Sequence, residues 1–175
     1  MKAPEKPLDI VTESGEVMAT AGYEEAHKHG LRHRSVHMIV LNGKGEVYLT
    51  KRAKTKPNFP GYYEGSVAGH ADAGETTGQA ALRELKEELG VTARPEDLHD
   101  LGEFHHDDRL PNGWIENEIT TLYLLRYDGK IVVDRREIED AGFQSKERIM
   151  QMINGKEKFT PGFLELFRRC QQLKV

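Results

Sequence analysis

The sequence contains a single cysteine, Cys170, so an internal disulfide is excluded and a reducing compartment such as the cytoplasm is expected. It also has no apolar run close to the roughly 20 residues that span a bilayer, and its first residues, MKAPEKPLDIV, lack the apolar centre of a signal peptide. A basic excess is absent as well, because the net charge is -4 with both signs mixed. We therefore expect a cytoplasmic protein with no membrane or nucleic-acid partner.

The composition is that of an ordinary globular protein, with 37% hydrophobic and 31% charged residues in a chain of 175. We expect a single domain over residues 1–175, with a core at about 33–155 and an N-terminal hairpin and C-terminal helix packed on it. Alternating or β-branched segments predict strands, and Ala/Leu/Glu-rich segments predict helices. Strands are expected within 8–22, at 35–41, 46–51, 98–107 and 115–126, the last two joined by Pro111-Asn112-Gly113; helices are expected at 77–89, 145–153 and 162–173. Strands on both sides of a central helix favour an α/β or α+β fold.

The helix predicted at 77–89 has clear start and stop signals. Thr76 and Gln79 are spaced as a capping box, and Gly90 is the usual end of a helix. Apolar residues recur at every fourth position and form the stripe that we expect to be buried: Ala81, Leu85 and Leu89.

Three acidic residues, Glu84, Glu87 and Glu88, lie within one turn of this helix and share a sector of its surface. Arg83, four residues before Glu87, is placed to form an ion pair, and the loop before the helix brings Glu75 toward the same sector. One interpretation is a solvated acidic face. The other is a site for Mg²⁺ or Mn²⁺, whose preferred ligands are carboxylate oxygens, waters and substrate phosphates.

The segment 69–91 resembles the Nudix box, Gly-x5-Glu-x7-Arg-Glu-U-x-Glu-Glu-x-Gly-U, in which U is apolar. Every defined position is filled, by Gly69, Glu75, Arg83, Glu84, Leu85, Glu87, Glu88, Gly90 and Val91. The resemblance implies the Nudix fold, an α/β/α sandwich with a mixed β-sheet. It also implies hydrolysis of a small molecule in which a nucleoside diphosphate is linked to another group X, and it makes a homodimer plausible.

The resemblance to the Nudix family also implies roles for the box residues. Glu84, Glu87 and Glu88 would hold catalytic Mg²⁺ or Mn²⁺, together with the main-chain carbonyl of Ala68, next to Gly69. Arg83 would orient the carboxylates, and Glu75 would anchor the loop or serve the metals indirectly. Bound divalent ions neutralise phosphate oxygens and activate water, and one glutamate could act as general base.

Residues 8–126 are also similar to the branch of this family that includes isopentenyl diphosphate isomerase and related bacterial hydrolases. The similarity lies in EEAHKHGLRHRSVH, LTKRAKTKPNFPGYYEGSVAGH and GWIENEI. It implies a second site for a transition metal, formed by His27, His33, His70, Glu116 and Glu118. Alternatively, His33 caps a strand or binds phosphate, and Glu116 joins the first metal cluster. We interpret the other histidines as structural or solvated: His29, His99, His105 and His106.

Two departures from the isomerase pattern favour hydrolysis over isomerisation. Ala68 stands where the isomerase has a cysteine, and a methyl group takes no part in acid–base chemistry. His106 stands where a tyrosine is expected. The alternatives to a hydrolase are an isomerase-like enzyme, which Ala68 disfavours, and a module that binds a diphosphate without turnover.

The segment KRAKTKPNFPG is rich in cations, and Arg52 and Lys56 match phosphate-contacting positions of the same branch. Arg34 is a further candidate for substrate binding. Arginine can hold two phosphate oxygens at once, whereas lysine contributes a point charge. The alternative for Lys51 and Lys54 is a solvated basic loop.

Overall fold

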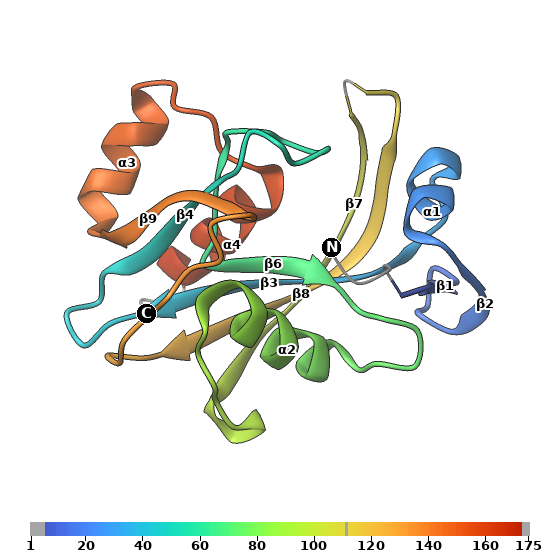
Figure 1. The fold of residues 1–175 in the computed structure, drawn as a ribbon, viewed down its shortest axis with the longest axis horizontal. Helices are drawn as coiled ribbons and strands as arrows, with labels where there is room; N and C mark the ends of the chain where they lie inside the picture. Colours follow the sequence, from blue (N-terminus) through green and yellow to red (C-terminus); the bar gives the residue numbers. More distant parts are fainter. Residues whose placement is uncertain (1–5, 111, 173–175) are drawn as a thin grey trace.

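The computed structural model describes residues 6–110 and 112–172 of the chain. Nine strands form one mixed sheet. The strands are β1 Leu8–Val11, β2 Val17–Ala21, β3 His33–Leu41, β4 Val47–Arg52, β5 Tyr63–Glu64, β6 Val67–His70, β7 Leu98–Arg109, β8 Ile115–Arg126 and β9 Ile138–Gln144. The helices are α1 Tyr23–His29, α2 Thr77–Leu89, the 3-10 turn η1 Pro95–Asp97, α3 Lys146–Asn154 and α4 Pro161–Gln172 (Figure 1). None of the described helices has the length and apolar character needed to cross a membrane.

Strand β3 is the centre of the sheet. It runs parallel to β8 over its whole length, from His33 opposite Glu118 to Leu41 opposite Arg126. It meets β4 only at Leu41 and Val47, and farther back it pairs with β6 instead, Val36 facing Gly69. The divergence of β4 from β3 therefore makes room for β6 at the centre of the sheet.

Alternate residues of β3 enter hydrophobic clusters on opposite faces of the sheet, as the two-residue period of a strand requires. Val36, Met38 and Val40 pack with Leu85 and Leu89 of α2. Ile39 and Leu41 pack with residues of α3 and α4. In Figure 1, α2 lies along one side of the central strands, apart from α3 and α4. This arrangement confirms the expected α/β/α sandwich with a mixed sheet.

The predicted elements are largely confirmed. The hairpin around Ser14-Gly15, the β3–β4 turn, the antiparallel β7–β8 pair and the helices after residue 145 are all present. Two predicted features include residues outside the described part of the chain. These residues are Pro111 in the predicted turn and Leu173 at the predicted end of the last helix. Three strands were not predicted: β5, β6 and β9.

Helix α2 begins and ends as the sequence predicts. The hydroxyl of Thr76 accepts a hydrogen bond from the Gln79 amide, and the Gln79 side chain accepts one from the Thr76 amide. Gly90 ends the helix in the left-handed conformation, at φ 64°. The residues of the predicted stripe are all fully buried: Ala81, Leu85 and Leu89.

Removal of the cap should destabilise the protein. We expect Thr76→Ala to lower the free energy of unfolding by about 1 kcal/mol, because the first turn loses its side-chain acceptor. Urea denaturation followed by circular dichroism measures the change. Thr76→Ser keeps the oxygen and serves as the control; equal losses in both variants would contradict the capping role.

Candidate active site

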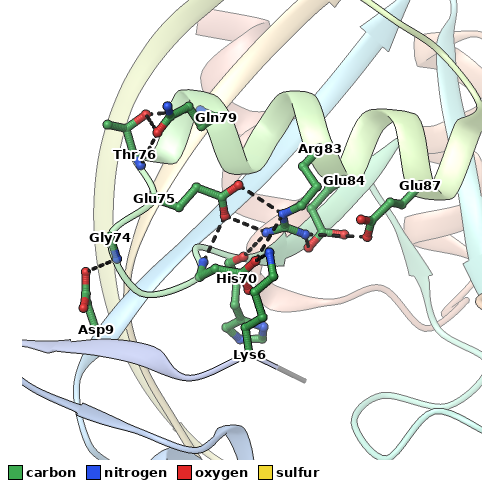
Figure 2. A network of polar contacts seen from close by, with 11 residues as sticks. Lys6, Asp9, His70, Gly74, Glu75, Thr76, Gln79, Arg83, Glu84 and Glu87 are labelled. Carbon is green, nitrogen blue, oxygen red and sulfur yellow. Dashed lines mark hydrogen bonds and ion pairs between the residues drawn. The ribbon is translucent and has the colours of Figure 1, made fainter. Parts of the chain in front are cut away.

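The guanidinium of Arg83 is the hub of a polar network at α2 (Figure 2). Its Nε and Nη2 donate to the two carboxylate oxygens of Glu75, at 3.1 and 2.8 Å. Its Nη1 donates to Glu84 at 2.6 Å, and Nη2 also donates to the carbonyl of His70 at 2.8 Å. One side chain thus joins the loop before the helix, the helix itself and the end of β6.

The loop before α2 is also tied to the N-terminal strand. The amide of Asp72 donates to Glu75 at 3.0 Å, and the amide of Gly74 donates to Asp9 at 2.8 Å. Lys6 forms an ion pair with Asp72 at 2.8 Å. The predicted return of Glu75 toward the acidic sector is therefore seen in the structure, and Arg83 is the residue that holds it there.

Glu84 lies directly against the backbone of β6 at Gly69. A Cβ atom added at Gly69 would overlap the Glu84 carboxylate and lie 2.7 Å from its Cγ, a distance that real Cβ atoms essentially never show. Glycine is therefore required at position 69 for the helix carboxylate to approach the strand. Burial raises the pKa of Glu84, and the charge and hydrogen bond of Arg83 oppose that rise.

Glu88 is buried among other acids. Burial raises its pKa well above the ordinary value, and repulsion from Glu64 and Glu84 raises it further, while Lys56 and Arg52 act in the opposite direction. Glu87 differs, because its side chain is 61% exposed and lies 3.6 Å from Arg83. A solvated acidic face thus describes Glu87 but not Glu84 or Glu88.

A second polar cluster lies on the opposite face of the sheet. The ligand atoms of four residues lie within 4.8 Å of one another: His27, His33, His70 and Glu118. Strand pairing places three of these side chains on one face of the sheet. His33 pairs with Glu118, and Ser35, which faces the same side as His33, pairs with His70. The fourth side chain, His27, comes from α1.

Two histidines of this cluster have their ring nitrogens oriented by the backbone. Nδ1 of His27 lies 2.8 Å from the carbonyl of Tyr23, and Nδ1 of His33 lies 2.8 Å from the carbonyl of Leu31. A carbonyl accepts only, so each Nδ1 carries a proton, and in the neutral ring each Nε2 presents a lone pair. Both Nε2 atoms are buried and have no hydrogen-bond partner among the described residues.

Glu118 is surrounded by imidazoles. Burial alone would raise its pKa, but His70, His106 and His33 hold the pKa well below the ordinary value. Nε2 of His70 lies 3.0 Å from Oε1 of Glu118, and Nε2 of His106 lies 3.3 Å from Oε2. Burial lowers the pKa of His106, but Glu118 and Asp108 together raise it to about 9.

Glu116, the fifth residue expected in the second site, is not part of the group of four. Its carboxylate instead accepts a hydrogen bond from Asn58 at 3.0 Å. Burial and repulsion by Glu118 raise its pKa to about 7. Because Glu116 lies two residues from Glu118 on β8, it faces the same side of the sheet but farther along the strand.

The three predicted substrate-binding cations already have partners. Arg52 donates to Glu64 at 2.7 Å and to the carbonyl of Asn58 at 3.1 Å. Lys56 forms an ion pair with Glu137, and Arg34 donates to the carbonyl of Gly15 in the β1–β2 turn. The charges of Arg52 and Lys56 act on Glu88, so these two lie near the acidic cluster.

Comparison with known proteins identifies the family of the chain. The family model for the NUDIX domain matches residues 31–167, which is most of the chain. The chain belongs to the Nudix hydrolase family. As a member of this family it is a hydrolase that acts on pyrophosphate bonds.

Two relatives of this Nudix hydrolase bear the names of the two kinds of protein in the branch considered above. An uncharacterised Nudix hydrolase of Streptomyces coelicolor is 33% identical over 98% of this chain and 91% of its own length. Isopentenyl-diphosphate Delta-isomerase 2 of Photorhabdus laumondii is 30% identical over 84% of this chain and 81% of its own length.

Solved structures share the Nudix fold. A protein of Deinococcus radiodurans, DR0079, has a TM-score of 0.77 and 26% identity, and the match covers 94% of this chain and 99% of that one. The Nudix domain of NrtR from Shewanella oneidensis, complexed with ADP ribose, has a TM-score of 0.64 at 16% identity over 89% of this chain and 100% of that one. The latter match shows the fold alone.

Two histidines beside these clusters were not recognised as site residues from the sequence. His106, interpreted as structural or solvated, contacts Glu118 and Thr120, whereas His29, His99 and His105 are exposed. His37 on β3 faces the same side of the sheet, and burial lowers its pKa to about 4. The position of His106 in the isomerase pattern was the one signal for it in the sequence.

The need for glycine at position 69 is testable. A methyl group there would push Glu84 away from β6 and break its contact with Arg83. We expect Gly69→Ala to lower the free energy of unfolding by about 1–3 kcal/mol and to abolish any stabilisation by Mn²⁺. Thermal unfolding with and without Mn²⁺ measures both effects.

Gly78→Ala is the matched control for this experiment. Gly78 lies within α2, and a Cβ there would meet only the Tyr123 hydroxyl at an ordinary 3.7 Å. Alanine in a helix reduces the entropy of the unfolded chain, so this variant should be neutral or more stable by about 0.4–1 kcal/mol. Similar behaviour of the two variants would contradict the packing of Glu84 on Gly69.

Proposed function

We propose that this Nudix hydrolase cleaves the diphosphate linkage of a small molecule, a nucleoside diphosphate or a derivative of one, in a reaction that depends on Mg²⁺ or Mn²⁺. The observation that carries the proposal is the placement of two buried or partly buried carboxylates: Glu84 lies against the β6 backbone at Gly69, and Glu88 lies near Glu84 and Glu64. The Nudix domain of NrtR, which shares the fold, was solved with ADP ribose, and this makes ADP ribose a substrate to test first.

The donor set fits a hard divalent cation. Glu84, Glu87 and Glu88 supply carboxylate oxygens, and the carbonyl of Ala68 lies on the strand that Glu84 approaches. Acidic residues this close raise one another's pKa, as seen for Glu88, and a bound cation would remove that repulsion. Arg83 and Glu75 are positioning residues, because their contacts fix the loop and Glu84.

A bound divalent ion supplies charge neutralisation at the phosphate oxygens and a more acidic water. The chain contributes the rest of the chemistry. One glutamate of the cluster accepts the proton of the attacking water, and Arg52 and Lys56, which lie near Glu88, bind the phosphates after exchanging their acidic partners. Arg34 is a weaker candidate for this role, because it is bound to the Gly15 carbonyl.

We also propose that the histidine cluster binds a transition metal such as Zn²⁺, Mn²⁺ or Fe²⁺ through His27, His33, His70 and Glu118. The buried Nε2 lone pairs of His27 and His33 are the supporting observation, since a buried polar atom without a partner is costly. Glu116 would join this set only if the hydrogen bond that it accepts from Asn58 were broken.

Isomerase activity is the second candidate, favoured by the relative from Photorhabdus laumondii and by the histidine cluster. Ala68 argues against it, because its methyl group can neither donate nor accept a proton. A diphosphate-binding module without turnover is the third. Cytoplasmic location, a homodimer and a single Nudix domain over residues 1–175 stay predictions from the sequence and the family.

The carboxylate roles predict a large loss of activity on removal of charge. We expect Glu87→Gln or Glu88→Gln to lower kcat/KM by about 100- to 1000-fold, because each loses a charged metal ligand. Chromatography of the products formed with Mg²⁺ or Mn²⁺ from nucleotides, nucleotide sugars, dinucleoside polyphosphates and isoprenyl diphosphates measures the effect.

Glu96→Gln is the matched control, since Glu96 is an exposed residue of η1. It should leave kcat/KM unchanged. A Glu87→Gln or Glu88→Gln variant as active as the wild type on every good substrate would refute the assigned roles. Binding of a substrate without product from the wild type would instead favour the binding module, and isomerised product without phosphate would favour the isomerase.

The second metal site predicts that a metal stabilises the protein as isolated. Dialysis against a chelator should lower Tm by about 5–10 °C, as expected for a cation present at about 100 times its Kd. Elemental analysis before and after dialysis identifies the metal. His33→Ala should lose it and His99→Ala, at an exposed position, should keep it; a protein with no transition metal under any loading condition would exclude the site.

A further inference from the structure

The face of the sheet that carries the histidine cluster continues toward α4 as a row of polar side chains. Ser35 and His37 follow His33 on β3, and Thr120 follows Glu118 on β8. The hydroxyls of Ser35 and Thr120 lie 2.6 Å apart, and Nε2 of His106 lies 3.1 Å from Thr120. Beyond His37 this face becomes apolar with Ile39 and Leu41.

His37 lies directly beside β6, the strand that contains Ala68. The residue that pairs with His37 on β6 is Ala68, whose carbonyl is the candidate metal ligand. Partners in an antiparallel pair direct their side chains to the same face, so His37 and Ala68 lie next to each other. Both are partly exposed. The charge of Arg52 acts both on Glu88 and on His37, so a substrate whose diphosphate binds at Arg52 and Glu84 brings its remaining group X near His37.

The imidazole of His37 is fixed by packing rather than by hydrogen bonds. A Cβ atom added at Gly162, at the start of α4, would lie 2.6 Å from Nδ1 and 3.0 Å from Nε2 of this ring. The absence of a side chain at position 162 therefore provides the space that the ring occupies. Nδ1 is buried and has no hydrogen-bond partner within residues 6–110 and 112–172.

The packing indicates which nitrogen carries the proton. A buried N–H without an acceptor is rare in proteins, whereas an acceptor without a donor is tolerated more often. The buried Nδ1 is therefore the bare nitrogen, and the proton lies on Nε2. His37 thus presents a hydrogen-bond donor to whatever lies against this face of the sheet.

We propose that His37 is a specificity-determining residue, which donates a hydrogen bond from Nε2 to an acceptor atom of the group X and so selects polar X groups, such as a nucleoside or a sugar, over hydrocarbon chains. This inference rests on the proposed hydrolase function. A hydrocarbon chain on this face would leave the Nε2 donor of His37 without an acceptor, which disfavours binding.

The test compares His37→Leu with His37→Gln on polar and apolar substrates. ADP-ribose, a nucleotide sugar and geranyl diphosphate are hydrolysed with Mg²⁺, and kcat/KM is measured for each. We expect His37→Leu to lose about 10- to 100-fold on the polar substrate that the wild type prefers and to lose nothing on geranyl diphosphate. His37→Gln, whose amide donates from a similar position, should restore most of the loss.

A stability measurement separates this role from a structural one. Leucine removes a buried nitrogen that has no partner, so His37→Leu should unfold at the same temperature as the wild type or higher. Equal loss of kcat/KM on all substrates, or a wild type that hydrolyses geranyl diphosphate as well as any polar substrate, would overturn the proposal.

Failure of the hydrolase function would be recognised separately. If the wild type cleaved the diphosphate of no substrate, the readout becomes the rise in Tm that each compound produces. The polar diphosphates should then raise the Tm of the wild type more than geranyl diphosphate does, and His37→Leu should abolish that difference. An unchanged difference would refute the role of His37 in either case.

Discussion

The site depends on one cation, the guanidinium of Arg83, placed among carboxylates that would otherwise repel one another. Its donors reach Glu75, Glu84 and the carbonyl of His70 at 2.6–3.1 Å. Arginine remains charged at every relevant pH, and its planar fork matches carboxylate geometry. Glu84 can therefore stay against β6 although burial raises its pKa. The loop, the helix and the strand keep their relative positions for the same reason.

Strand β6 lies between two polar clusters that favour different kinds of cation. On one face Gly69 leaves space for an acidic side chain of α2, and on the other face His70 joins imidazoles around Glu118. The acidic cluster has more negative charge than its neighbouring cations balance, whereas the histidine cluster has buried lone pairs without donors. Both conditions favour cations, but of different kinds, hard at the carboxylates and softer at the imidazoles.

Local signals account for what the sequence predicted. Helix α2 has its cap, its stripe and its terminating glycine within a few residues, and the long strands β7 and β8 have alternating or β-branched segments. Strand β6 is short and contains a glycine, and the exposed or half-buried positions of β9 hide its alternation. The Nudix box could be found from spacing alone. The positions of His37 and His106 depend on strand pairing over long sequence distances, which no local pattern specifies.

The neighbouring roles of Gly69 and His70 make the strand intolerant of changes in chain length. Consecutive residues of a strand point to opposite faces, so adding or deleting one residue before Gly69 would exchange the two faces. A bulky imidazole would then meet the helix carboxylate, and the histidine cluster would lose a ring. Divergence of this segment within the family should therefore proceed by substitution, while insertions accumulate in the loops that flank it.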